Sequence, residues 1–392
     1  MLRSLVGSEM CIRDSAYAER LGLWGEGSAF SSKRAFVSAI SNGGLAAMEV
    51  VAKDIKAMGL YAARSLSYEG VEVEQLTHTL NADQRKMYDA MAKAWQIVLR
   101  NIEAAMESAG SREDSRARSA VMSAFWGAHQ RFFNGVLTAL AVPAVIGDIQ
   151  SQLDSGNSAV IQLVNTNEAT QERKLAEVSL SGQELDEIDM SPRDVLMQYL
   201  NNAFPVTLYE EYLDADQNKQ RRAVKDTAGN IVLDPQSVAL RDKMLMNLAT
   251  LKVPEGALEQ IINHFGPDAV AEVTGRKQRL VRQRNGKTVI EKLGNAKSLS
   301  DVRDFNEGKR RILIFSDAGG TGRSYHSDLR IKNQQRRVHY LLQPGWRADK
   351  AIQGLGRTHR TNQANAPLVK TVTTDLKSQR RFISSIARRM DQ

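Results

Sequence analysis

Short apolar runs alternate with helical or glycine-rich segments over the C-terminal quarter of this 392-residue chain. The runs in "RRILIFSDAGGTG" and "RRVHYLLQPGW" predict buried strands that end in a loop and a turn, and "PLVKTVTTD" predicts a third strand. Between them, "RADKAIQGLGRTHR" has the pattern of a helix followed by a loop. Because strands connected by crossover helices form parallel sheets, this alternation predicts an α/β fold with flanking helices.

More elements are predicted upstream. "NSAVIQLVNTNEA", "VEVEQLTHTL" and "DAVAEVTGR" each have the apolar pattern of a strand, and the basic stretch around Asn285-Gly286 predicts a hairpin. Residues 81–106 predict one long helix. Residues 111–156 predict a further helical region that Pro143 interrupts. We interpret residues about 170–260 as an acidic, largely helical insertion.

The composition is that of a globular protein, with 42% hydrophobic and 25% charged residues. The sequence shows no apolar run of membrane-spanning length, so we expect no membrane partner. A single cysteine, Cys11, excludes a disulfide scaffold and a thiolate metal site. That cysteine lies in "MLRSLVGSEMCIRDS", which looks like a translated sequencing adapter, so we expect residues 1–15 to be an artefact. The alternative is a natural disordered N-terminus.

Positive charge is concentrated in the C-terminal third. Residues 275–392 hold 27 Lys/Arg against 9 Asp/Glu, whereas the rest of the chain holds 26 against 36. This asymmetry favours a polyanionic partner, most simply nucleic acid. A solvated basic surface would give the same count, and charge alone does not decide between the two.

Two short matches to nucleotide-site motifs are set aside. "GKT" at 286–288 lacks the glycine of a phosphate-binding loop five residues earlier, where Val281 stands, so we interpret it as part of the hairpin. "DEID" at 186–189 resembles an acidic magnesium box but does not follow an apolar strand. Neither stretch is therefore expected to bind a nucleotide.

Two other segments carry a stronger signal. In "ILIFSDAGGTG", a buried strand delivers Ser316 and the loop of Gly319, Gly320, Thr321 and Gly322 to the carboxyl edge of the sheet, where ligands of α/β folds bind. Small residues let a phosphate approach the backbone amides there, although a plain tight turn has the same composition.

The second segment is "QGLGRTHRTNQ", which places Arg357 and Arg360 three residues apart behind a glycine. Two guanidinium groups on one side of a turn could face one phosphate and stabilise the charge that develops when it is transferred. A basic surface turn is the simpler alternative. We interpret His359 as a residue that shapes this loop, and His326 and His339 as ordinary polar positions.

In this order, "VIQLVNT", "VAEVTGR", "ILIFSDAGGTG" and "QGLGRTHRTNQ" resemble the second motor domain of superfamily-two helicases and translocases. Longer strings, among them "YAERLGLWGEGSAF", "FWGAHQRFF" and "GWRADKAIQGLGRTHRTNQANAP", look like the strawberry notch family, in its bacterial or phage form. The resemblance covers nearly everything from Ala16 onward. One departure is Thr321, at a position where helicase loops of this type often have arginine, so translocation without strand separation fits equally well.

The resemblance implies a two-lobed ATPase with RecA-like folds. We expect residues 16–110 to be the tail of the first lobe with linker helices, and residues 111–392 to be the second lobe. The phosphate-binding loop and the acidic magnesium box would then lie upstream of Ala16, and the chain would be a C-terminal fragment that is inactive alone. ATP and Mg²⁺ would be held mainly by that first lobe.

The resemblance also assigns roles to individual residues. It implies arginine fingers at Arg357 and Arg360, contacts to ATP at Gln353, Gly356 and Gly322, and nucleic-acid contacts at Ser316, Gly319, Gly320, Thr321 and Thr166. The implied partners are nucleic acid, most simply DNA, and the first RecA-like lobe.

The implied function is that of the C-terminal lobe of an ATP-dependent helicase or translocase. Its location would be the cytoplasm of a bacterium or phage-infected cell, or the nucleus if the chain is eukaryotic. Two alternatives stay open. One is a non-catalytic module with a helicase fold that regulates transcription or acts as a scaffold. The other is part of a methylase–helicase anti-restriction protein of a mobile element.

Overall fold

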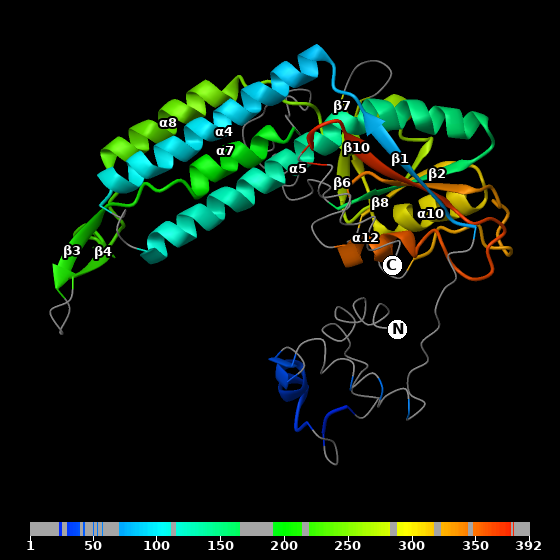
Figure 1. The fold of residues 1–392 in the computed structure, drawn as a ribbon, viewed down its shortest axis with the longest axis horizontal. Coiled ribbons are helices and arrows are strands. Elements are labelled where there is room, and N and C mark those ends of the chain that lie inside the picture. Colours follow the sequence, from blue (N-terminus) through cyan, green and yellow to red (C-terminus); the bar gives the residue numbers. More distant parts are fainter. Residues whose placement is uncertain are drawn as a thin grey trace.

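A six-stranded parallel sheet organises the C-terminal part of the chain in the computed structural model (Figure 1). The structure describes residues 23–25, 30–39, 42–43, 50, 53, 57, 70–110, 115–164, 191–213, 219–282, 288–316, 323–343, 348–377 and 379. The strand order is β1-β10-β9-β2-β8-β5, and every neighbouring pair is parallel. The strands are β1 (Glu72–His78), β2 (Ser158–Leu163), β5 (Val270–Val273), β8 (Ile312–Ser316), β9 (Arg337–Leu341) and β10 (Leu368–Thr374). The predicted α/β class and parallel sheet are confirmed.

Helices cover both faces of this sheet. Because successive strand side chains point to opposite faces, Ala159, Ile161 and Leu163 of β2 pack with α5 and α9, whereas Val160 packs with α10 on the other face. The helices are α5 (Ser115–Asp154), α9 (Ala257–Phe265), α10 (Asn295–Asn306) and α12 (Ala348–Leu355). All six residues of β2 are buried, which is why its sequence is apolar with few interruptions.

The edge strand β1 belongs to the same sheet, although it lies in the segment 16–110 that we assigned to the first lobe and its linker. Glu72 to His78 pair in register with Leu368 to Thr374 of β10, close to the other end of the described chain. A boundary at 110 therefore does not separate β1 from this sheet. The local pattern could predict a strand here but not its partner, because the pairing joins residues almost 300 positions apart.

A helical arm extends from the sheet and consists of α4 (Ala82–Ser108), the N-terminal part of α5, α7 (Arg193–Asn202) and α8 (Pro235–Ala249) (Figure 1). Its separate core is built around Trp95, which packs edge-on against Phe125 and Phe132. At the far end lies the antiparallel hairpin of β3 (Tyr209–Leu213) and β4 (Lys219–Ala223). The described part of the expected insertion is thus helical with one added hairpin.

Helix α4 confirms the predicted helix at 81–106, and its start follows from local chemistry. The Asn81 side chain accepts a hydrogen bond from the amide of Gln84, and the Gln84 side chain accepts one from the amide of Asn81. This capping box satisfies two of the amides that a helix start leaves without partners. The predicted hairpin around 285 is likewise confirmed by β6 (Gln278–Arg282) and β7 (Thr288–Lys292).

Pro143 does not interrupt α5, which corrects the prediction. A proline inside a helix deprives the carbonyl four residues earlier of its amide partner. That carbonyl belongs to Ala139, and it accepts a hydrogen bond of 3.2 Å from Nε2 of Gln260 in α9. A tertiary contact thus replaces the lost backbone bond, at the place where α5 passes from the arm to the sheet.

Residues Ala117–Asp154 of α5 are long and apolar enough to cross a membrane by length and composition, with half of the apolar window buried in the fold. This differs from the expectation that no run reaches that length. The buried residues of α5 belong to two cores, because Phe132 and Val136 pack in the arm and Val145 and Ile149 pack under the sheet. Such double packing explains an apolar composition in a core helix.

Candidate functional site

The segment that follows α12, residues 356–363, is called the arginine loop here. Backbone hydrogen bonds fix it to the segment after the glycine loop: the amide of Tyr325 donates to the carbonyl of Arg357 at 2.7 Å, and the amide of Leu329 donates to the carbonyl of Asn362 at 3.0 Å. Asn362 has a φ of 65°, a left-handed conformation that asparagine tolerates. Its side-chain amide donates to Asp328 at 2.9 Å, so the turn is held from both sides.

The two predicted arginine fingers occupy different environments. Arg357 is half-buried, with its guanidinium carbon 5.4 Å from the ring centroid of Phe315 at the end of β8. Arg360 is exposed, and its Nε donates to the carbonyl of Gly356 at 3.0 Å. Among the residues that the structure describes, no carboxylate pairs with Arg360. Its terminal nitrogens are therefore available to an anion approaching from solvent.

A buried polar network lies beneath the arginine loop. Nε2 of His339 in β9 is 3.1 Å from Oε1 of Gln162 in β2, and Nδ1 of His339 is 2.8 Å from the hydroxyl of Thr358 in the loop. All three side chains are buried. Burial, and then the nearby charge of Arg357, lower the pKa of His339 to about 3, so the imidazole is neutral at physiological pH.

The two glycines of "QGLG" differ in how much space a side chain would have at each position. A Cβ on Gly354 would lie 2.0 Å from Oε1 of Gln162, so only glycine lets α12 pack this closely on β2. A Cβ on Gly356 would lie 3.4 Å from the carbonyl oxygen of Gln353, which is an ordinary contact. Gly356 was among the predicted site residues, and Gly354 was not. A glycine inside a predicted helix can indicate that the helix packs closely against a neighbouring element, and Gly354 is such a glycine.

Ser316 lies where the sequence placed it, at the carboxyl end of β8 and in register with Leu163 of β2. Ser316 is 1% exposed, and its hydroxyl has no hydrogen-bond partner among the residues that the structure describes. Nearby, burial raises the pKa of Tyr325 to about 12, an effect that the charges of Arg357 and Arg323 oppose.

Gln353 is half-buried in α12. The other predicted contacts, Gly319, Gly320, Thr321, Gly322 and Thr166, lie outside the described residues.

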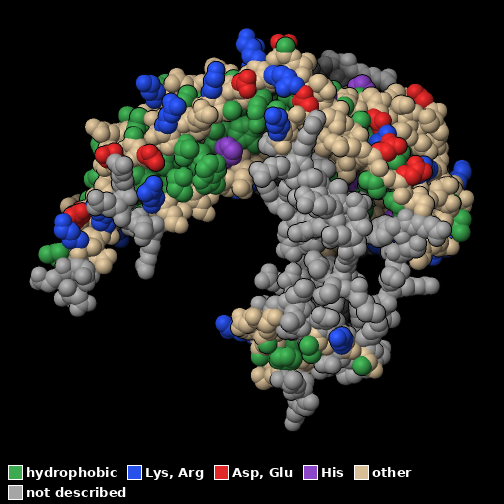
Figure 2. All heavy atoms as spheres, in the orientation of Figure 1, with side chains coloured by type: hydrophobic (Ala, Val, Ile, Leu, Met, Phe, Trp, Pro, Cys, Tyr) green, Lys and Arg blue, Asp and Glu red, His purple; other side chains and the backbone are tan. Residues whose placement is uncertain are grey.

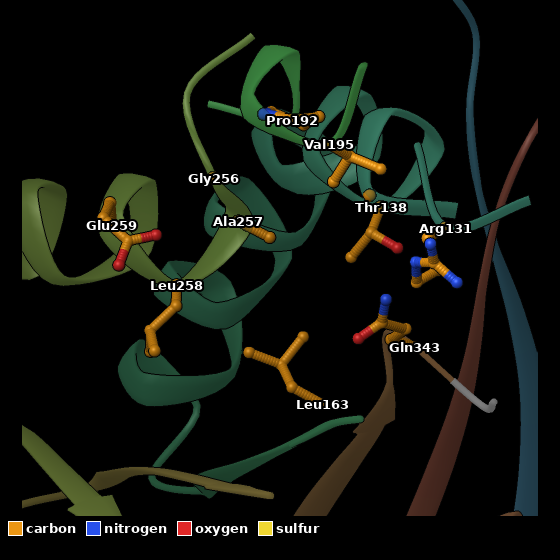
Figure 3. Close-up of a pocket in the computed structure, with 11 residues that line it drawn as sticks. Arg131, Thr138, Leu163, Pro192, Val195, Gly256, Ala257, Leu258, Glu259 and Gln343 are labelled. Carbon is orange, nitrogen blue, oxygen red and sulfur yellow. The ribbon is translucent and has the colours of Figure 1, made fainter. Parts of the chain in front are cut away.

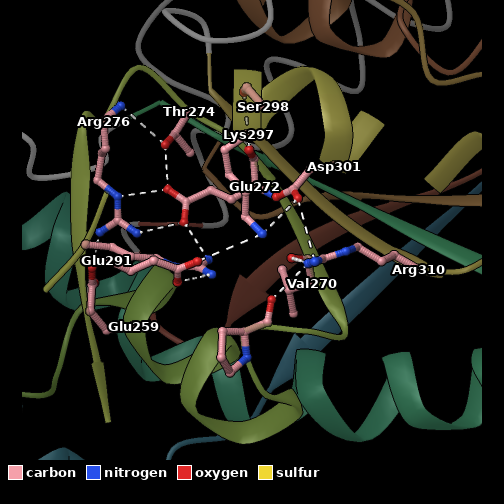
Figure 4. Close-up of polar contacts among 12 residues, drawn as sticks. Glu259, Val270, Glu272, Thr274, Arg276, Glu291, Lys297, Ser298, Asp301 and Arg310 are labelled. Carbon is pink, nitrogen blue, oxygen red and sulfur yellow. Dashed lines mark hydrogen bonds and ion pairs between the residues drawn. The ribbon is translucent and has the colours of Figure 1, made fainter. Parts of the chain in front are cut away.

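The arginine of "VTGR" proves to be internal. Arg276 is 5% exposed and pairs with Glu272 at 2.9 Å and with Glu259 of α9 at 2.6 Å (Figure 4). Glu272 also pairs with the buried Arg279 at 3.2 Å, and its amide donates to Asp301 of α10. These contacts bind β5, α9, α10 and the β6–β7 hairpin together. The motif therefore stabilises the edge of the sheet.

This network changes the meaning of the C-terminal charge excess. Arg276, Arg279, Arg310 and Arg337 are all buried, so part of the basic count is internal. On the face shown in Figure 2, Lys and Arg are interspersed with Asp and Glu over the helical arm and do not form one patch. Arg360 of the arginine loop is exposed, so this loop is an anion-binding candidate among the described residues.

A cavity lies at the carboxyl end of β2, between the sheet and the arm (Figure 3). Leu163 and Gln343 line it from the sheet, Arg131 and Thr138 line it from α5, and the start of α9 at Gly256 completes it. Gln343 also accepts a hydrogen bond from the amide of Val164 at 3.0 Å, which holds the end of β2. The predicted site residues that the structure describes do not line this cavity. Within the described ranges, no group of three or more metal-binding side chains occurs.

His339 was expected to be an ordinary polar position, and Gln162 was not among the predicted site residues. Both are polar residues inside otherwise apolar strands, and a buried polar side chain in such a run needs a hydrogen-bond partner. That signal could have marked them, but it could not have named Thr358 as the partner of His339. His359 is 4% exposed and lies 3.0 Å from the Gln363 amide through Nδ1, as suits a residue that shapes the loop.

The parallel sheet with helices on both faces is that of a RecA-like α/β lobe of the helicase C-terminal type. A family model described as the C-terminal domain on strawberry notch homologues matches residues 256–392, which include the arginine loop. A second model, described as a P-loop containing NTP hydrolase, matches residues 7–90.

Similar proteins carry the same family name. The chain is 28% identical to protein FORGETTER 1 of Arabidopsis thaliana, 29% identical to strawberry notch homolog 1 of Rattus norvegicus and 29% identical to strawberry notch homolog 2 of Mus musculus. Each match covers 97% of this chain, but the chain spans only 38%, 35% and 33% of those relatives. Together these matches support the assignment of the chain to the strawberry notch family of helicase-like proteins.

Proposed function

We propose that this chain supplies the second lobe of an ATP-driven motor, with Arg360 as the arginine finger that reaches the phosphate undergoing transfer. The observation that carries the proposal is the exposed Arg360 guanidinium, which pairs with no carboxylate in the described ranges and lies on a loop anchored to the parallel sheet. A guanidinium remains charged and offers a planar set of donors, which suits phosphate oxygens. Arg357, which lies over the ring of Phe315, adds a second positive charge to the same loop.

ATP and Mg²⁺ belong to this proposal as the substrate and its metal ion. The chemistry of the arginine loop fits ATP, because its donors match an anion whose charge increases in the transition state. Magnesium would be held mainly by the partner lobe. Bound Mg²⁺ would neutralise phosphate charge, and Arg360 would orient and stabilise the phosphate that is transferred.

DNA is the proposed track. The buried hydroxyl of Ser316, at the carboxyl end of β8, has no partner within the described part of the chain, and a phosphate contact would satisfy it. Contacts of this kind position the backbone and carry little sequence information. Affinity would therefore fall with salt and depend little on sequence.

The test is Arg360→Ala in the full-length gene product, with Arg100→Ala on the exposed face of α4 as the control. Arginine fingers contribute about a thousandfold or more to turnover, so we expect Arg360→Ala to abolish most DNA-stimulated ATP hydrolysis. DNA affinity should stay unchanged in both variants, and the control should hydrolyse ATP normally. Unchanged turnover in Arg360→Ala would remove this residue from catalysis and favour a non-catalytic, scaffolding role for the fold.

A further inference from the structure

The buried polar network under the arginine loop has no assigned role so far. It joins β2, β9 and the loop through Gln162, His339 and Thr358. The carbonyl of Leu355 ends the network, because it lies 3.1 Å from the Thr358 hydroxyl and accepts the amides of Thr358 and His359. The last turn of α12 is therefore tied to two central strands.

The chemistry of this network depends on a neutral histidine. A neutral imidazole donates at one nitrogen and accepts at the other. The Thr358 hydroxyl donates to the Leu355 carbonyl at 3.1 Å and also lies 2.8 Å from Nδ1 of His339, while Oε1 of Gln162 lies 3.1 Å from Nε2. Burial, and then the nearby charge of Arg357, lower the pKa of His339 and keep the imidazole neutral between these two partners.

We propose that His339 and Thr358 are positioning residues that fix the arginine loop on the sheet, and that Gln162 sets the orientation of His339. This inference rests on the proposed function of the loop. Thr358 lies between Arg357 and Arg360 in the chain. Its hydrogen bond to His339 therefore restrains the backbone from which both arginine side chains extend. Small displacements of a catalytic group lower turnover more than they lower binding.

The experiment compares Thr358→Val with Thr358→Ser in the full-length gene product. Valine keeps the shape and removes the hydroxyl, whereas serine keeps the hydroxyl that reaches His339. We expect Thr358→Val to lower kcat for ATP hydrolysis by about tenfold to a hundredfold while changing KM for ATP by less than about threefold. Thr358→Ser should restore most of the turnover, which a purely space-filling role would not predict.

Hydrogen exchange of the backbone amides gives a second readout that does not depend on ATP. We expect exchange in residues 355–363 to be faster in Thr358→Val, by about tenfold, and to be unchanged in the helical arm. If Arg360→Ala abolishes turnover while Thr358→Val leaves both turnover and exchange unchanged, the positioning role is wrong and the proposed function stands. If both variants hydrolyse ATP normally, the proposed function is wrong, and the exchange rates alone decide whether the network anchors the loop.

Discussion

Replacing Gly354 with alanine should destabilise the lobe, although alanine favours helices more than glycine does. The new Cβ would lie 2.0 Å from Oε1 of Gln162 and 2.2 Å from its Cδ and Nε2, and that side chain is fully buried. Gln162 would have to move and would lose its contact with His339. The change therefore tests whether this close approach holds α12 against β2.

The magnitude follows from three contributions. Overpacking a filled core costs about 1–3 kcal/mol. Breaking the buried contact between Oε1 of Gln162 and Nε2 of His339 costs about 1–3 kcal/mol more. The better helix propensity of alanine returns about 0.5–1 kcal/mol. We expect the free energy of unfolding to fall by about 1–5 kcal/mol in Gly354→Ala.

Chemical denaturation followed by far-ultraviolet circular dichroism measures this change. The matched control is Gly356→Ala, two residues later, where the added Cβ meets only an ordinary contact and the expected effect is below about 0.5 kcal/mol. In a Gln162→Ala background the space is free, so the cost of Gly354→Ala should be smaller by about 0.5–3 kcal/mol. Equal stability of the two alanine variants, or an equal cost in both backgrounds, would refute the reasoning.

Two further predictions concern stability. Glu272→Gln would remove the carboxylate that the buried Arg276 and Arg279 share. Because Arg276 keeps Glu259 and Arg279 keeps Glu291, the free energy of unfolding should fall by about 1–3 kcal/mol, measured by denaturation at neutral pH. Burial raises the pKa of Glu272, but the Arg276 ion pair outweighs this and the pKa is lowered overall, so its contribution exists above the ordinary carboxyl pKa and is lost on acidification. Stability in the acidic range should therefore depend less on pH in Glu272→Gln than in the parent, and an equal dependence would contradict this. Gln260→Ala should cost about 0.5–1.5 kcal/mol because it leaves the Ala139 carbonyl without a donor. The cost should shrink in a Pro143→Ala background, where the backbone amide returns, and a cost that is the same in both backgrounds would contradict the explanation.

Several elements could be predicted from the sequence because their cause is local. The capping box at Asn81 marks the start of α4, and the alternation of "VEVEQLTHTL" marks β1. The position of Ser316 follows from the length of the apolar run before it. Arg357 and Arg360 could be chosen as candidates because their spacing and their glycine neighbours are visible in one short stretch.

Other features could not be predicted because their partners are distant in the sequence. Arg276 resembles a free basic residue until α9 and β5 bring Glu259 and Glu272 against it. Pro143 predicts a break until Gln260, more than a hundred residues later, supplies a hydrogen bond. In each case a nonlocal contact changes the interpretation of a local signal.

The sequence by itself determined which segments are strands and helices, and which residues have the chemistry to bind a phosphate, since both depend on side chains a few positions apart. Only the tertiary structure decided that β1 pairs with β10, that Gly354 packs against Gln162, and that His339 contacts Thr358 of the arginine loop. The physical reason is that a folded core fixes distances between residues hundreds of positions apart. Periodicity along the chain contains no information about those distances.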